Sequence, residues 1–208
     1  TGVKLINPTL FSNVVKTYER LALLRSKKGK ETELGKFFMR QDLSLEVKTR
    51  LATGRLADEN LKVGPAMIER AISLANGTSI SEVRRLLIDY GEHGEVAFLL
   101  QKPKEAVLTV EEVYDSIRML PRMSRIFERD LTVSSLLRAA TPEEAKYIVR
   151  LILGDLKLGY YESAVVSAVA KAYHVPVDLV NSAASVLGLT EGLMLASEGE
   201  FRLTEVKL

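Results

Sequence analysis

The chain of 208 residues is 47% apolar and 27% charged, a composition that excludes intrinsic disorder and fits one medium globular domain or two small lobes that share a core. It contains no cysteine and only His93 and His174, which excludes disulfides and thiolate chemistry and leaves little material for a zinc site or a Ser-His-Asp triad. The net charge is +2, and the sequence shows neither a membrane-spanning apolar run nor a signal-peptide pattern, so we expect an intracellular protein, cytoplasmic in a prokaryote or nuclear in a eukaryote.

Positive charge is concentrated near the N-terminal end. Residues 1–30 carry seven basic side chains against one acidic side chain, and the run from Arg25 to Lys30 (RSKKGK) is the centre of this charge. Two interpretations stay open for the run: a solvated loop between helices, or a patch that faces phosphate groups.

Helical periodicity dominates the sequence, because apolar residues recur at steps of three and four. It predicts a first helix with an apolar face over residues 10–21, a second helix around Leu34, Phe37 and Phe38, and a short third helix over residues 43–52. The spacing of Leu34, Phe37 and Phe38 also resembles the peptide by which replication proteins bind a sliding clamp. Core packing and clamp binding both remain open for these three residues.

The next helix is predicted to begin at Gly64 and Pro65 and to end at Gly77, since glycine is typical of the left-handed residue that follows a helix. Its predicted inner face carries Met67, Ala71 and Leu74.

Three further helix starts are marked by capping residues. Ser79 precedes a helix that continues through Leu87. Thr109 and Thr141 each stand three residues before a glutamate, which is the pattern of a capping box. The acidic pairs in these first turns, Glu111-Glu112 and Glu143-Glu144, are expected to have structural roles at the positive ends of the helices. His93 is expected on a loop.

Two more helices are predicted over residues 162–173 and 176–187. Only the tail, residues 201–208, alternates like a strand, and we expect it to be the lead-in to a following domain.

A faint internal repeat relates the two halves of the chain. Residues 51–56 and 61–64 resemble residues 151–159, since in both places a glycine-flanked turn with a basic residue leads into a helix rich in small and β-branched residues. We therefore expect an all-α fold, a multi-helix bundle of two pseudo-symmetric lobes at roughly 8–105 and 106–200, in one domain that spans 1–208.

The turn after the helix that begins at Pro142 is the strongest chemical signal. Gly154, Lys157 and Gly159 lie between a helix end and a helix start, where glycine permits close approach of the backbone and free N–H groups attract anions. Most turns of this kind only connect helices, so a plain connection and an anion-binding site both stay open. The turn is not a P-loop, because no Lys-Ser or Lys-Thr pair follows the second glycine and no strand precedes the turn.

Four segments together resemble a known family. They are residues 61–72 (LKVGPAMIERAI), 91–97 (GEHGEVA), 108–114 (LTVEEVY) and 142–159 (PEEAKYIVRLILGDLKLG). In this order they are similar to the N-terminal DNA-binding domain of ATP-dependent DNA ligases of the archaeal and eukaryotic replicative type, and the resemblance extends over residues 11–208.

The resemblance implies an all-helical, pseudo-symmetric domain that binds the minor groove on both sides of a nick. It places the turn from Gly154 to Gly159 on the DNA backbone, and the repeat extends this to the corresponding turn of the other half. Where the family usually has a Gly-x-Gly-Ser stretch, this sequence reads PRMSR over residues 121–125. The candidate DNA-binding residues are Gly54, Arg55, Lys62, Gly64, Arg122, Arg125, Gly154, Lys157 and Gly159.

The adenylation motif Lys-x-Asp-Gly occurs nowhere in the sequence. We therefore expect this chain alone to be inactive, with ATP and Mg²⁺ acting in a catalytic domain outside it, and no catalytic residue, metal or cofactor in the chain itself. The expected partner of this monomer is nicked double-stranded DNA in replication, repair or recombination, with a sliding clamp as a further candidate and no membrane. The alternatives are a helical protein-interaction module without a ligase role and, less well supported, a helix-turn-helix regulator.

Overall fold

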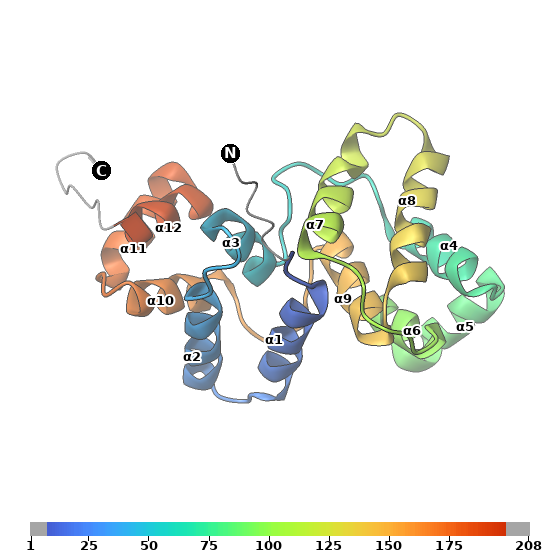
Figure 1. Ribbon diagram of the computed structural model, residues 1–208, viewed down its shortest axis with the longest axis horizontal. Coiled ribbons are helices and arrows are strands. Elements are labelled where there is room, and N and C mark those ends of the chain that lie inside the picture. The colour runs from blue at the N-terminus through green and yellow to red at the C-terminus, as the bar shows by residue number, and fades with distance from the viewer. Residues whose placement is uncertain (1–7, 199–208) are drawn as a thin grey trace, which may run out of the picture. The chain divides into compact units, whose positions relative to one another are not determined.

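The computed structural model describes residues 8–198 and confirms an all-α fold (Figure 1). Over these residues it contains twelve α-helices, one short 3-10 helix and no strand. The helices are α1 (Phe11–Leu23), α2 (Lys27–Phe38), α3 (Leu45–Thr53), α4 (Pro65–Asn76), α5 (Ile80–Tyr90), α6 (His93–Leu100), α7 (Val110–Met119), η1 (Leu120–Arg122), α8 (Ile126–Ala139), α9 (Pro142–Leu153), α10 (Glu162–Ala172), α11 (Val177–Leu187) and α12 (Leu189–Glu198). The strand expected over 201–208 lies outside the described residues.

The helices form two compact units, and each unit is assembled from two stretches of the chain. Unit 1 contains residues 8–16 and 55–156, and unit 2 contains residues 17–54 and 157–198. These units are not the consecutive lobes suggested by the repeat, because each takes residues from both halves of the sequence. The pseudo-symmetry of the halves stays a prediction.

In unit 1, α4 packs against α8 and α6 packs against α9. The predicted capping box of α9 is confirmed: the Thr141 hydroxyl accepts from the N–H of Glu144 at 3.2 Å, and Glu144 Oε1 accepts from the N–H of Thr141 at 2.9 Å. At α7 the Thr109 hydroxyl accepts from the N–H of Glu112 at 3.1 Å, but it also donates to the Glu112 carboxylate, so the reciprocal half of that box differs from the prediction.

The inner face of α4 differs from the predicted one. Ile68, Ala71 and Ile72 are buried, whereas Leu74 is 50% exposed. The helix packs against α5, α6 and α8, so its buried stripe follows the i, i+3, i+4 spacing from Ile68 instead of from Met67.

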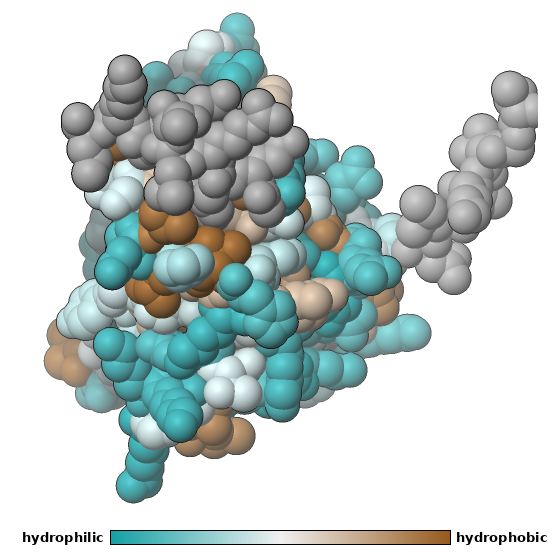
Figure 2. Space-filling view, turned by 90° about the vertical axis from the view of Figure 1, so that its left-hand side faces the viewer, coloured by the Kyte–Doolittle hydropathy of each residue, from teal (hydrophilic) through white to brown (hydrophobic). Residues whose placement is uncertain are grey.

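In unit 2, α2 packs against α10, and α11 packs against α12. The apolar face predicted around Leu34 is the inner face of α2: Leu34, Phe37 and Phe38 are all at most 4% exposed. The face of the molecule drawn in Figure 2 is mostly hydrophilic, as expected when the apolar faces of the helices point inward.

Over residues 8–198 no helix combines the length and the apolar character that a membrane crossing requires. His93, expected on a loop, is instead the first residue of α6, whose N-cap is Glu92.

Candidate nucleic-acid interface

The two glycine turns predicted from the repeat share one backbone pattern. α3 ends at Gly54, with φ 75°, and α9 ends at Gly154, with φ 77°. Downstream, Lys62 and Lys157 both adopt left-handed backbone angles, with φ 59° and 54°. Because side-chain-bearing residues adopt this region at a cost, two lysines in the same conformation after equivalent helix ends support the local repeat.

On the side of unit 1, Arg150 holds the end of α9 against the start of α6. Its guanidinium donates to Glu92 Oε1 at 2.7 Å, to Glu95 Oε1 at 3.3 Å and to the carbonyl of Leu156 at 3.3 Å. The arginine is only 8% exposed, so it positions the turn and is not a surface cation. Gly94 is required here, because a Cβ would lie 2.9 Å from Arg150 Nε.

On the side of unit 2, the turn from Lys157 to Gly159 is tied to two helices that come much earlier in the chain. Buried Lys30 of α2 donates to the carbonyl of Leu158, and the Tyr160 hydroxyl donates to the carbonyl of Ala52 in α3 at 2.5 Å. Unit 2 therefore brings the Lys157–Gly159 turn next to the helix end that carries Gly54.

Gly159 has φ 72°, and a Cβ on it would lie 2.7 Å from Lys30 Nζ. The backbone angle favours glycine at this position, and a Cβ would also have to displace the Lys30 ammonium. Next to this turn, Tyr161 at the N-cap of α10 is 84% exposed.

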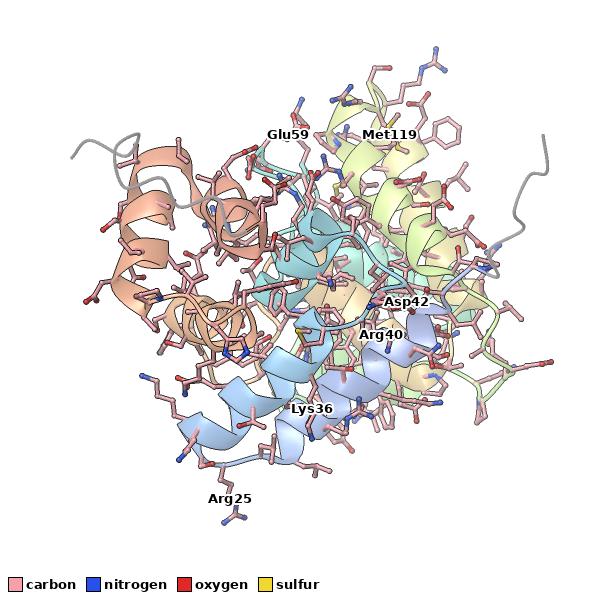
Figure 3. The ribbon with its side chains drawn as sticks, turned by 60° about the vertical axis from the view of Figure 1, so that its left-hand side comes forward. Arg25, Lys36, Arg40, Asp42, Glu59 and Met119 are labelled. Carbon is pink, nitrogen blue, oxygen red and sulfur yellow. The ribbon has the colours of Figure 1, made fainter. Side chains whose placement is uncertain are left out.

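The basic run over residues 25–30 is neither a plain loop nor wholly a surface patch. Ser26 is the N-cap of α2, and its hydroxyl accepts from the N–H of Gly29 at 3.0 Å. Arg25, Lys27 and Lys28 are exposed, and Figure 3 shows Arg25 pointing away from the protein, whereas Lys30 is buried.

A second basic cluster of unit 2 was missed from the sequence. Thr17, Arg20, Glu33, Lys36, Phe37 and Arg40 line a hollow of about 320 Å³. Arg20 Nε lies 2.7 Å from Glu33 Oε1. Arg40 donates to both oxygens of Asp42, and this hydrogen bonding raises the pKa of Arg40 (Figure 3). The cluster joins residues of α1, α2 and the following loop, so sequence spacing alone gives no signal for it.

The other predicted residues lie in unit 1. Arg55 and Lys62 are on the connection from α3 to α4, and Gly64 is the N-cap of α4. A Cβ at Gly64 would meet nothing within 4 Å, and its φ of −101° is open to any residue, so local packing does not require this glycine. Arg122 and Arg125 lie between η1 and α8, at the end of the first and the N-cap of the second.

The clamp interpretation of Leu34, Phe37 and Phe38 meets a physical obstacle. A clamp peptide must present these side chains to its partner, but all three are buried in α2 where it packs on α10. Glu31 beside them is bound to Lys171 of α10 at 2.9 Å. The structure favours the core-packing alternative.

His93 and the acidic residues near it also have structural surroundings. His93 Nε2 lies 3.2 Å from Glu69 Oε2, and Arg84 Nε lies 3.0 Å from the other oxygen of Glu69. Burial raises the pKa of Glu69, but the hydrogen bonds from His93 and Arg84 outweigh burial, so the pKa of Glu69 is lowered overall. Across residues 8–198 no group of three or more His, Asp or Glu side chains is arranged to hold a metal ion.

Comparison with known proteins gives a consistent family. The family model described as DNA ligase N terminus matches residues 10–170. DNA ligase 1 of Methanosarcina acetivorans is 34% identical over 174 residues, which cover 78% of this chain and 30% of that protein. The DNA ligase of Nanoarchaeum equitans is 37% identical over 72% of this chain and 28% of its own length. That of Thermococcus fumicolans is 29% identical over 83% of this chain and 34% of its own length. The chain thus spans about a third of the length of these curated relatives.

Proposed function

This chain belongs to the DNA ligase N-terminal family, and we propose that it binds double-stranded DNA around a nick without sequence preference. Such a domain contributes to ligation by positioning the duplex, while the chemical steps take place in another part of the ligase. We expect ATP and Mg²⁺ to act in that other part.

One observation carries the proposal beyond family membership. The Lys157–Gly159 turn is held to α2 by the hydrogen bond from Lys30 to the carbonyl of Leu158, and the adjacent Tyr160 donates to the carbonyl of Ala52 at the end of α3. Its left-handed glycine lets the backbone come close to a ligand, and Lys157 supplies positive charge beside it. A rigid turn with close backbone approach and a cation suits a phosphate, which every DNA sequence presents alike.

The first test is a titration of labelled nicked duplex with the chain, followed by fluorescence anisotropy at about 50 and about 200 mM salt. If six or more phosphates are neutralised, affinity should fall by about three orders of magnitude between the two salt concentrations. Lys157→Glu should weaken binding at the lower salt concentration. Lys102→Glu, the same charge reversal at an exposed residue after α6, is the matched control and should bind more tightly than Lys157→Glu.

The alternatives give different results in the same titration. A clear preference for one DNA sequence would indicate a regulator. Absence of binding at low salt would indicate a helical protein-interaction module. Ligation of nicked DNA by a complete ligase that is unaffected by deletion of residues 1–208 would contradict the positioning role.

A further inference from the structure

Positive charge is concentrated on the helical hairpin of α1 and α2 in unit 2. Residues 17–40 contain seven basic side chains against three acidic ones. Two of the acidic side chains contribute little to the surface, because Glu31 is 8% exposed and the side chain of Glu33 is 13% exposed. Of the seven basic side chains only Lys30 is buried, and the others form the basic face of unit 2: Arg20, Arg25, Lys27, Lys28, Lys36 and Arg40.

Two arginines of the basic face line the hollow between α1 and α2, and each is held along one edge of its guanidinium. Arg20 donates through Nε to Glu33 at 2.7 Å and through Nη2 to Thr17 at 3.2 Å. Arg40 donates through Nε and Nη2 to Asp42 at 2.9 and 2.6 Å. Within the described part of the chain, Nη1 of both arginines has no hydrogen-bond partner, so each arginine keeps a donor for an anion.

The rest of the hollow suits the side chain of another molecule. Lys36 at its edge has a side chain that is 73% exposed, and its Nζ lies 3.9 Å from Glu33, so it is only loosely paired. A hollow of about 320 Å³ is at the lower end of the volumes of small-ligand pockets, which is room for one or two carboxylate side chains. The phosphates of a duplex lie on a convex surface, which passes over such a hollow without filling it.

An exposed apolar side chain stands beside the basic face. Leu23 is 82% exposed and lies one helical turn after Arg20 on α1. Figure 3 shows Arg25 at the tip of the hairpin, with Lys36 and Arg40 further along it. Phosphates would neutralise these cations but leave Leu23 uncovered, whereas a peptide with both acidic and apolar side chains complements both kinds of group.

We propose that the basic face binds an acidic segment of another protein, with a carboxylate in the hollow and an apolar side chain against Leu23. Arginine binds carboxylates through paired N–H donors, as Arg40 does with Asp42. Alternation of acidic and apolar residues is typical of disordered interaction segments. The inference goes beyond the proposed DNA-binding function, because none of these residues belongs to the glycine turns.

The probe is a fluorescein-labelled peptide of repeating Asp-Leu-Glu-Leu units, titrated with the full chain and followed by anisotropy at about 50 mM salt, where surface charges are weakly screened. This peptide should bind. The same peptide with Asn and Gln in place of its acidic residues should not bind, because the cations have lost their partners. A peptide with Ser in place of Leu should bind more weakly, since Leu23 then stays uncovered.

Two substitutions locate the binding site, and each has a matched control. Lys36→Glu should lower affinity for the acidic peptide roughly tenfold, whereas Lys102→Glu, the same reversal at an exposed residue of unit 1, should bind like the parent chain. Leu23→Ser should lower affinity roughly fivefold. Ile88→Ser on α5, where the native side chain is 84% exposed, should leave the affinity unchanged. Circular dichroism verifies that each variant is folded.

Labelled nicked duplex, titrated in parallel, separates this inference from the proposed DNA-binding function. If Lys36→Glu weakens duplex binding as much as peptide binding, the cations belong to the DNA contact and the inference is overturned. It is also overturned if the acidic and amide peptides bind alike, or if Lys36→Glu and Lys102→Glu bind the acidic peptide alike. Equal binding of the serine peptide would replace the peptide by a bare anion as the occupant.

The two functions can also fail separately. A parent chain that binds duplex but not the acidic peptide overturns the inference while DNA binding stands. A parent chain that binds the acidic peptide in the expected way but no duplex supports the inference and contradicts the proposed DNA-binding function.

Discussion

Among single side chains, Glu144 has one carboxylate oxygen that stabilises a helix start and one that is buried at a cost in stability. Its Oε1 closes the capping box with Thr141, whereas its buried Oε2 has no hydrogen-bond partner. Burial raises the pKa of Glu144, although the hydrogen bonds from Thr141 oppose this shift. The charged form therefore costs stability at neutral pH.

Glu144→Gln keeps an acceptor for Thr141 and removes the buried charge. We expect the free energy of unfolding at pH 7 to rise by about 1 kcal/mol. Because burial raises the pKa of Glu144 in the folded state, this carboxyl stabilises the fold fully at pH values below its unfolded pKa, and that stabilisation is lost as pH rises through the folded pKa. The gain in unfolding free energy of Glu144→Gln should therefore vanish toward pH ~4. Urea unfolding at pH 4 and pH 7 measures both values. Glu143→Gln, at the exposed neighbouring position, is the control. A lower free energy of unfolding for Glu144→Gln than for the parent chain at pH 7 would show that the buried charge does not destabilise the fold.

Two glycines with similar backbone angles provide a second test. Gly77 has φ 64° and open space where a Cβ would lie, whereas a Cβ on Gly159 would meet Lys30. Gly77→Ala should cost about 1–2 kcal/mol from the left-handed backbone alone. Gly159→Ala should cost more and should weaken binding of nicked duplex, which the Gly77 variant leaves unchanged. Equal stability losses and equal affinities would show that Lys30 does not restrain the turn.

Among the helices, capping chemistry was the most reliable guide. Thr141 with Pro142, Ser79 and the αL glycine at Gly77 marked helix ends that the structure confirms. No start was predicted for α2, because its first turn holds lysines, which the helix dipole disfavours at that end. α6 was missed because its N-cap is a glutamate and its short sequence has no clear polar face.

Only those parts of the candidate interface that depend on residues close together in the sequence could be predicted. The glycine turns follow from sequence, because a left-handed residue after a helix is a local requirement. Lys30 and Tyr160 could not be found in this way, because their acceptors lie 128 and 108 residues away along the chain. A lysine in a basic run gives no sign that it will be buried.

The link between α2 and the turn before α10 is itself testable. Lys30→Met retains the aliphatic stem but leaves the carbonyl of Leu158 without its donor, which should cost about 1–3 kcal/mol of unfolding free energy. Lys27→Met removes the same charge at an exposed position of α2 and should stay within about 0.5 kcal/mol of the parent chain. Thermal unfolding compares the stabilities of the two variants. Equal losses of stability would show that Lys30 has no structural role at the turn.

For the molecule as a whole, the division into units predicts the effect of truncation. A chain that ends at Leu156 keeps all of unit 1 but leaves unit 2 with residues 17–54 alone. Because α2 would lose α10 and expose Leu34, Phe37 and Phe38, we expect trypsin to cleave first within residues 17–54 while 55–156 stays protected. A chain that ends at residue 198 should resist cleavage in both regions, and protection of 17–54 in the truncated chain would contradict the division.

The interleaved units also determine the order in which the protein can mature on the ribosome. Residues 17–54 leave the exit tunnel before α10, the helix against which α2 packs, because α10 lies beyond residue 156. The segment therefore lacks this packing partner while about a hundred further residues are synthesised. During that interval its apolar face is available to chaperones and to other nascent chains. Unit 1 can fold first, whereas the apolar face of α2 is buried, and so protected from aggregation, only after α10 has left the tunnel.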